Sequence, residues 1–257
     1  MTLGSTIGFP YVWAGMIGNM SAKVLIDQAK ELTRSLSSLS FSDPVTHVYN
    51  PLEHAWSPHR QYLERYGKGK KKVIFLGMNP GPWGMTQTGV PFGEVELVRN
   101  WMGIEAKVKA PKHENPSRRV EGFDCKRSEV SGRRLWGYFS ERFPKAEDFF
   151  KDHFVLNHCP LVFMEASGRN RTPDKLPLSE SGPLTEICDR HLEPCVETLK
   201  PEVLVGVGGY ATKVLRRVFG DERYRIETLL HPSPASPIAN RGWEAQAHQQ
   251  LKKMGLV

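Results

Sequence analysis

The apolar positions of the chain predict a long helix near the N-terminus. From Leu25 to Leu39, apolar residues recur every three or four positions, which is the pattern of an amphipathic helix. We expect this helix over residues 21–39. The mildly apolar stretch before it, residues 1–20, contains Pro10 and several glycines and has no basic leader, so we interpret it as a flexible N-terminal extension.

Four short, continuous apolar runs predict strands that are buried on both faces. They cover residues 73–76, 154–156, 203–207 and 226–230. The spacing between and after them predicts helices over residues 93–101, 131–142, 184–199, 210–219 and 242–253. Strands that alternate with helices are typical of a mainly parallel sheet covered on both sides. We therefore expect an α/β fold that forms a single domain over residues 21–257.

The overall charge favours a polyanionic partner. The formal net charge is +7 and the isoelectric point is about 9.2. Residues 107–134 hold nine Lys and Arg against four acidic residues, and residues 66–72 add four lysines. These cations either contact phosphates or lie in a solvated loop, and the sequence leaves both readings open. No apolar run approaches the roughly 20 residues that a membrane helix needs.

The cysteine spacing argues against a metal centre. Four cysteines show neither a CxxC pair nor the His/Cys spacing of a zinc site: Cys125, Cys159, Cys188 and Cys195. We expect free, reduced thiols, with no metal and no cofactor.

Polar or glycine residues follow each predicted strand. The first strand leads into GMNPGPWGMTQTGVPFGE (77–94), the second into Asn157, the third into Gly208 and the fourth into His231. The carboxyl ends of parallel strands lie along one edge of a sheet, where such folds bind ligands. We therefore expect two amides, Asn79 and Asn157, to meet the imidazole of His231 at a site.

These side chains suit the cleavage of a base from its sugar. The carboxamide of Asn157 offers the donor and acceptor that match a planar imide such as uracil, and Phe92 can stack on the ring. His231 can stabilise a developing oxyanion, and Asn79 can hold a water. The strand-exit loops contain no evident carboxylate pair for sugar-polymer hydrolysis.

Two other functions fit parts of the sequence. The stretch GVGGYA (206–211) is an incomplete dinucleotide-binding fingerprint, since no acidic residue follows at the expected distance. The basic residues 107–134 also suit a nucleic-acid-binding protein without enzymatic activity.

Six blocks of the chain, in order, resemble the single-strand-selective monofunctional uracil-DNA glycosylases, a family of the uracil-DNA glycosylase superfamily. The resemblance extends from about residue 45 to the C-terminus, and the blocks are GMNPGPWGMTQTGVPFGE (77–94), EVSGRRLWG (129–137), NHCPLVF (157–163), SGRNRTPDKLP (167–177), VGVGGYA (205–211) and HPSPASPIANRGWEAQA (231–247). It implies a three-layer α/β/α sandwich around a four-stranded, mainly parallel sheet.

The resemblance also implies a role for each matching residue. Asn79 and His231 correspond to the catalytic residues, which position the attacking water and stabilise uracil O2. The substrate-binding residues are those that contact the base, namely Met78, Gly81, Met85, Phe92 and Asn157. The segment after the last strand corresponds to the one that enters duplex DNA, and its expected DNA-binding residues are Ser233, Pro234, Ala235, Ser236, Pro237, Asn240, Arg241 and Gly242.

The chain departs from the family pattern at two positions. Trp83 stands where the family often has Phe, and we expect the outer side of the loop to accommodate it. Ala235 stands where the family often has an arginine, and the nearest cation is Arg241.

The resemblance implies a DNA repair enzyme that flips uracil or 5-hydroxymethyluracil out of DNA and leaves an abasic site. Its partners would be single- and double-stranded DNA carrying uracil or oxidised pyrimidines. It would act as a monomer, in the nucleus if the source is eukaryotic and otherwise in the cytoplasm near the nucleoid.

Overall fold

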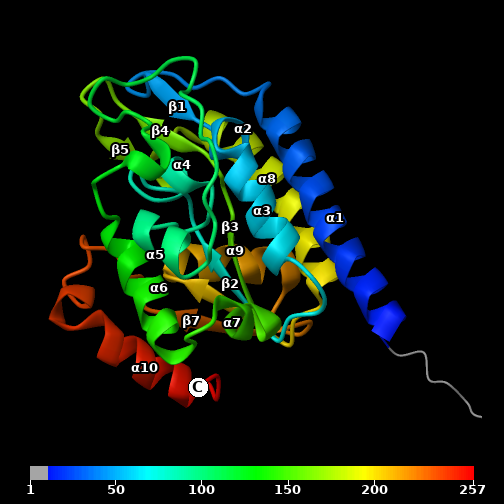
Figure 1. Cartoon of the computed structure of the whole chain (residues 1–257). Coiled ribbons are helices and arrows are strands. Elements are labelled where there is room, and N and C mark those ends of the chain that lie inside the picture. The colour runs from blue at the N-terminus through cyan, green and yellow to red at the C-terminus, as the bar shows by residue number, and fades with distance from the viewer. Residues whose placement is uncertain (1–10) are drawn as a thin grey trace, which may run out of the picture.

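The computed structural model describes residues 11–257 of the chain (Figure 1). Helix α1 spans Tyr11–Leu36 and buries Leu25, Ala29 and Leu32. The predicted helix is confirmed, but it begins ten residues earlier than expected. Residues 11–20, which we expected to belong to a flexible extension, are part of this helix. A glycine costs a helix only about 1 kcal/mol, so the glycines in this stretch do not prevent it. Residues 1–10 lie outside the described residues.

The four predicted strands form one parallel sheet in the order β3-β2-β6-β7. Strand β2 spans Val73–Gly77, β3 His153–Asn157, β6 Val203–Val207 and β7 Arg225–Leu229. Every residue of β2 and β6 is buried, as a strand covered on both faces requires. Strand β7 lies at the edge and is more exposed.

Helices cover both faces of this sheet (Figure 1). Helix α9, Gly209–Phe219, packs on β2, β6 and β7, with α8, Leu178–Leu199, and α1 outside it. The other face carries α6, Val130–Arg142, whose Phe139 ring lies 5.4 Å from that of Phe75 in β2. The expected three-layer α/β/α sandwich is therefore present.

The remaining helices include both predicted and unpredicted ones. Helices α5, Val95–Asn100, and α10, Trp243–Lys253, agree with the sequence pattern. The pattern did not predict the short elements α2 Pro51–His54, α3 Trp56–Tyr66, α4 Met85–Thr88, α7 Ala146–Asp152, η1 Gly122–Asp124, η2 Pro173–Lys175 and η3 Ala239–Arg241.

A second, antiparallel sheet was also not predicted. It has the order β1-β4-β5, and its strands are His47–Tyr49, Val162–Met164 and Asn170–Arg171. Strands of two or three residues are too short to show a period of two. This sheet holds the chain that follows β3 and thereby brings residues 170–172 towards the end of the main sheet.

The basic segment, residues 107–134, is irregular up to the start of α6 but is anchored to the fold. Asn115 is fully buried, its backbone N–H donates to the Tyr49 hydroxyl at 2.6 Å, and its amide donates to the Glu165 and Ala166 carbonyls. Most of its lysines and arginines stay exposed. A fixed backbone with outward cations is compatible with phosphate contact, which stays a prediction.

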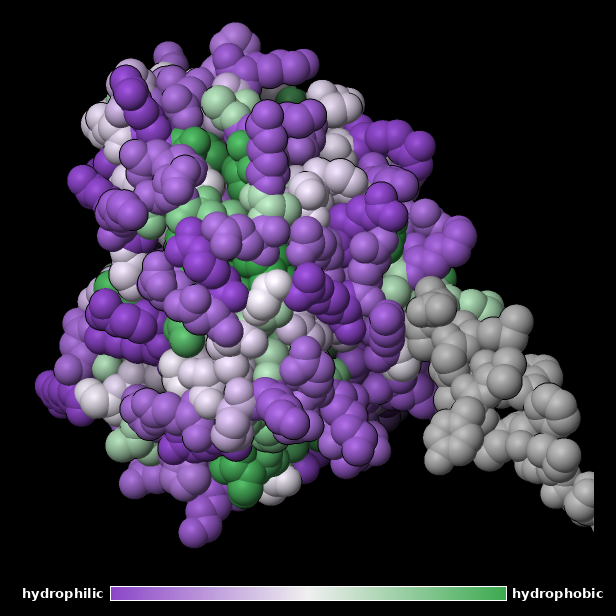
Figure 2. Space-filling view, viewed as in Figure 1, coloured by the Kyte–Doolittle hydropathy of each residue, from purple (hydrophilic) through white to green (hydrophobic). Residues whose placement is uncertain are grey.

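Hydrophilic side chains cover most of the face shown in Figure 2, with small separate hydrophobic patches. In the described part of the chain, no helix is long and apolar enough to cross a membrane, and no cluster of His, Cys, Asp and Glu could hold a metal ion. All four cysteines are free and buried.

Tyr62 forms hydrogen bonds with backbone groups at the outer edge of β3. Its buried hydroxyl donates to the Val155 carbonyl at 2.9 Å and accepts from the Val155 N–H at 3.3 Å. Tyr62→Phe leaves both backbone groups without a partner, so we expect the free energy of unfolding in urea to fall by about 1–3 kcal/mol. The control is Tyr224→Phe, which removes a hydroxyl from a partly exposed ring. Equal effects of the two changes would contradict this role.

Candidate active site

Three strand exits of the parallel sheet open into one cavity of about 370 Å³. The loop after β2, the last residue of β3 and the turn after β7 meet there. The cavity is lined by all seven residues that the resemblance assigns to chemistry and base binding, namely Met78, Asn79, Gly81, Met85, Phe92, Asn157 and His231. The predicted convergence of two amides and an imidazole is therefore present.

Gly77 lets the Asn157 and Phe92 side chains approach the end of β2. It pairs in register with Asn157 on β3. A β-carbon at Gly77 would lie 2.6 Å from the Phe92 ring and would also clash with the Asn157 side-chain oxygen. Only a residue without a side chain therefore fits between the amide and the ring.

The Asn157 side chain has one polar atom that the described part of the protein leaves unpaired. Its Nδ2 lies 3.4 Å from the Met85 sulfur, while its Oδ1 is buried with no hydrogen-bond partner. Buried polar atoms are rarely left unpaired, so this oxygen marks a position for a ligand N–H. The amide thus offers one donor and one acceptor side by side.

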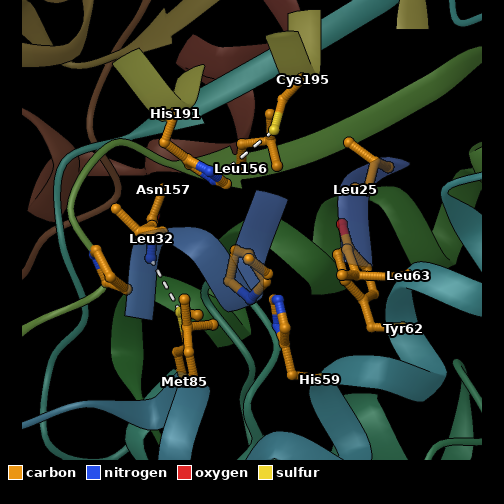
Figure 3. Close-up of a pocket in the computed structure, with 14 residues that line it drawn as sticks. Leu25, Leu32, His59, Tyr62, Leu63, Met85, Leu156, Asn157, His191 and Cys195 are labelled. Carbon is orange, nitrogen blue, oxygen red and sulfur yellow. Dashed lines mark hydrogen bonds between the residues drawn. The ribbon is translucent and has the colours of Figure 1, made fainter. Parts of the chain in front are cut away.

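Behind Asn157 lies a second, internal cavity of about 30 Å³ (Figure 3). Asn157 and Met85 line both cavities, and the imidazoles of His59 and His191 line the inner one. Burial lowers the pKa of each of these two histidines to about 4, so both are neutral at physiological pH. The two imidazoles behind the Asn157 amide are therefore uncharged.

Phe92 holds its ring over the cavity through an uncommon backbone conformation. Its backbone φ is +54°, a value that residues other than glycine rarely adopt. The conformation is fixed on both sides, since the Phe92 carbonyl accepts from the Glu94 N–H at 2.8 Å and the Pro91 carbonyl accepts from the Trp136 indole at 3.0 Å. Strain that the surrounding structure holds in place is typical of functional sites.

His231 is a neutral hydrogen-bond donor in this structure. Burial lowers its pKa to about 4. The Ser233 N–H donates to its Nδ1 at 3.0 Å, so the proton of the neutral ring is on Nε2. The Phe92 and His231 ring centroids lie 6.1 Å apart. Gly208 of GVGGYA, at φ +89°, packs against the back of the imidazole.

Asn79 has one side-chain atom left for a ligand. Its Nδ2 donates to the Leu161 carbonyl at 3.1 Å and to the Pro80 carbonyl at 3.3 Å. These bonds orient the amide so that Oδ1 is the free acceptor. An acceptor fixed in this way can hold a water but is too weak a base to remove its proton.

The segment after His231 forms a braced loop beside the cavity. Arg134 of α6 donates to the Pro232 carbonyl and to the Asn240 side-chain oxygen, both at 2.9 Å, and Asn240 in turn donates to the Pro234 carbonyl at 2.8 Å. The Asn240 amide is therefore engaged within the protein. Ser233 and Pro234 line the cavity. The other residues predicted to bind DNA lie on the loop or at its end, and their DNA contacts stay predictions: Ala235, Ser236, Pro237, Asn240, Arg241 and Gly242.

Ile238 stands out on this loop, although the sequence did not single it out. Its side chain is 55 % exposed, and its backbone carbonyl accepts from the Gln246 amide at 2.8 Å. An apolar side chain thus projects from this loop, three residues after Ala235.

Trp83 is not on the outer side of its loop, so that prediction is wrong. The indole is half-buried and lines the cavity, and the Arg118 and Arg127 guanidinium groups lie 5.4 and 4.6 Å from the ring centroid. The basic segment that supplies these arginines folds over the loop, which a one-dimensional pattern cannot show.

Glu129 is a candidate functional residue that we did not predict, because it precedes a helix and does not follow a strand. It lines the cavity from the residue that precedes α6, and its Oε2 is buried without a hydrogen-bond partner. Burial and, after it, the nearby Glu94 raise the pKa of this carboxyl to about 7. Its only signal in the sequence is its place at the start of the block EVSGRRLWG.

Comparison with known proteins agrees with this arrangement. The family model of the uracil DNA glycosylase superfamily matches residues 64–252. Proteins named single-strand selective monofunctional uracil-DNA glycosylase from Rattus norvegicus, Mus musculus and Bos taurus are each 47 % identical over 238 residues, which is 92 % of this chain and 86, 85 and 88 % of theirs.

A solved structure supports the fold. The crystal structure of wild-type Pedobacter heparinus SMUG2 superimposes with a TM-score of 0.62 at 18 % identity and covers 89 % of this chain and 97 % of that one. With a family model over most of the chain and relatives at 47 % identity, the chain belongs to the uracil-DNA glycosylase superfamily.

Proposed function

We propose that this chain is a monofunctional DNA glycosylase that hydrolyses the bond between uracil and deoxyribose in DNA and leaves an abasic site. The observation that carries the proposal is the pair of unsatisfied groups in one cavity. The Asn157 Oδ1 awaits a donor, and the neutral His231 presents an Nε2–H. Uracil offers an N3–H and an O2 acceptor to meet them. The names of the rat and mouse relatives agree with this activity.

The base enters the cavity only after it leaves the helix stack. Flipping costs a few kcal/mol and least for an unpaired base. Phe92 then stacks on the ring, while Asn157 accepts from N3–H and donates to O4. Cytosine presents an acceptor at N3 and a donor at position 4, so the fixed Asn157 amide discriminates against it.

Bond cleavage follows from charge stabilisation and a positioned water. The bond between C1′ and N1 breaks, and its electron pair moves into the uracil ring towards O2. The His231 Nε2–H stabilises this charge without transferring its proton, as a donor in an oxyanion hole does. Water held by Asn79 Oδ1 adds to C1′ and releases its proton to solvent. No lysine lines the cavity in the described residues, so we assign no Schiff-base step.

The side of the pocket that faces C5 sets the range of bases. Gly81 has no side chain there, and Met85 is flexible, so a small substituent fits. A hydroxymethyl group can take the place and the hydrogen bonds of a pocket water, whereas a methyl group displaces the water without replacing its bonds. That loss costs about 1–3 kcal/mol. We therefore propose that the enzyme releases uracil and 5-hydroxymethyluracil and rejects thymine.

We propose single- and double-stranded DNA with uracil or oxidised pyrimidines as the partner, and action as a monomer. The matched relatives are mammalian. If the source is eukaryotic, we expect the protein in the nucleus, where this substrate lies.

His231→Leu tests the catalytic role of the imidazole. We expect the single-turnover rate of uracil release to fall by about 100-fold or more, because the variant loses a donor needed mainly in the transition state. DNA affinity should stay within about twofold, since the ring is half-buried beside the base. An unchanged rate of release would refute the role.

Asn79→Ala and Asn157→Ala test the division between chemistry and recognition. We expect Asn79→Ala to slow single-turnover release while uracil-containing DNA still binds. Asn157→Ala should mainly weaken binding of uracil, because the variant lacks the donor and acceptor pair. The measurements are excision by excess enzyme and, separately, affinity for an uncleavable uracil analogue. Identical profiles for both variants would show that the roles are misassigned.

The basic segment is tested by salt dependence. We expect a variant with alanine at Lys107, Lys109, Lys112, Arg118 and Arg119 to bind duplex DNA with a shallower dependence of log K on log salt. The slope should change by about 0.9 for each phosphate contact removed. The control neutralises Lys252 and Lys253 at the end of α10. An unchanged slope in the five-residue variant would identify the segment as a solvated loop.

A further inference from the structure

Glu129 occupies a space that three glycines leave open for it. A β-carbon at Gly81 or at Gly132 would lie 3.0 Å from a carboxyl oxygen of Glu129, and one at Gly84 would clash with the carboxyl directly. The side chain makes no capping bond to α6 and extends across the loop after β2. The fold therefore places one carboxyl against the wall of the base cavity.

One oxygen of this carboxyl has no partner among the described residues. Glu129 Oε2 is buried and forms no hydrogen bond there. Among the residues that line the cavity, it is the only acid. A buried carboxyl without a hydrogen-bond partner lowers the stability of the fold. We therefore expect its partner to be a bound ligand.

The charged groups around Glu129 do not neutralise it. Glu94, at the start of α5, faces it and raises its pKa, while His231 across the cavity is neutral. Arg127, two residues earlier, stacks on Trp83, and Arg133 in the first turn of α6 is exposed. The carboxyl therefore changes between a neutral acid and an uncompensated anion close to pH 7.

The orientation of the base determines which part of it meets Glu129. This step rests on the proposed function. With O2 at His231 and the N3 and O4 edge at Asn157, C5 is the next ring atom beyond O4, and it faces Gly81 and Met85. The Glu129 carboxyl packs against that same Gly81.

We propose that Glu129 is a specificity-determining residue that reads the substituent on C5 of the base. As an anion it accepts a hydrogen bond from a hydroxyl group on that substituent and repels a substituent that is itself a carboxylate. As a neutral acid it no longer repels a carboxylate and can donate to it. The pocket therefore sorts oxidised bases by the charge of the C5 group.

Electrostatics sets the expected size of this selection. Two like charges about 5 Å apart at the edge of a protein repel strongly enough to change a rate by well over tenfold. The pKa of Glu129 is raised, so the anion is present above about pH 7 and is lost as the pH falls below it. Discrimination against a C5 carboxylate should therefore be strong at pH 8 and weak at pH 6.

The experiment compares three bases in otherwise identical single-stranded oligonucleotides: uracil, 5-hydroxymethyluracil and 5-carboxyuracil. Single-turnover rates are measured at pH 6 and pH 8 for the wild type, Glu129→Gln and the control Glu121→Gln. Glu121 is exposed on the basic segment and does not line the cavity, so it controls for the change in net charge. Each rate is divided by the rate on uracil for the same protein and pH.

We expect the relative rate on 5-carboxyuracil to fall by about tenfold from pH 6 to pH 8 in the wild type and in Glu121→Gln, because the neutral fraction of a carboxyl with a pKa of about 7 falls by about that factor. In Glu129→Gln it should be flat and about tenfold higher than in the wild type at pH 8, while the relative rate on 5-hydroxymethyluracil changes less than about threefold, because a carboxamide still accepts a hydrogen bond.

Relative rates that are unchanged in Glu129→Gln would overturn the proposal and leave the residue a purely structural one. A folded Glu129→Gln, verified by its melting temperature, that releases none of the three bases would also overturn it, since the carboxyl would then act in catalysis. A wild-type protein that fails to release uracil would instead refute the proposed function itself.

Discussion

The base pocket depends on the absence of a side chain at Gly77. Strand β2 is paired on both sides, so its last residue lies in the middle of the sheet edge with Asn157 directly opposite. The Asn157 amide and the Phe92 ring both pack over this one α-carbon. The Asn157 amide and the Phe92 ring can thus lie close together at the end of β2. A side chain at Gly77 would push the Asn157 amide and the Phe92 ring apart.

The loop after β2 is rigid because its polar groups are satisfied internally. Gln87 is fully buried; its amide donates to the Pro82 and Arg119 carbonyls, and its oxygen accepts from the Glu121 and Gly122 N–H groups. One side chain therefore ties the loop to the basic segment. The prolines of the loop reduce the conformational entropy lost on folding, and its glycines permit close packing. Gln87 supplies the long-range connection.

The sequence predicts the parts of the fold that repeat along the chain. Buried strands and amphipathic helices have a period, and the strand exits follow from the topology of a parallel sheet, so Asn79, Asn157 and His231 could be assigned together. The second sheet has strands too short to show a period, and α1 begins at Tyr11, well before its regular apolar positions start at Leu25. Glu129 and Trp83 reach the cavity from segments whose course is set by side-chain contacts such as those of Gln87. Such contacts leave no regular pattern.

Helix α6 connects the wall of the cavity to the loop after β7. Its N-terminal end carries Glu129 into the wall of the base cavity, and one turn later Arg134 holds the loop after β7 through Pro232 and Asn240. A helix is stiff over so short a distance. If a DNA strand displaces that loop, it must either break two hydrogen bonds of one guanidinium or move the helix and the cavity wall with it. The shape of the cavity is thus mechanically coupled to the position of the loop after β7.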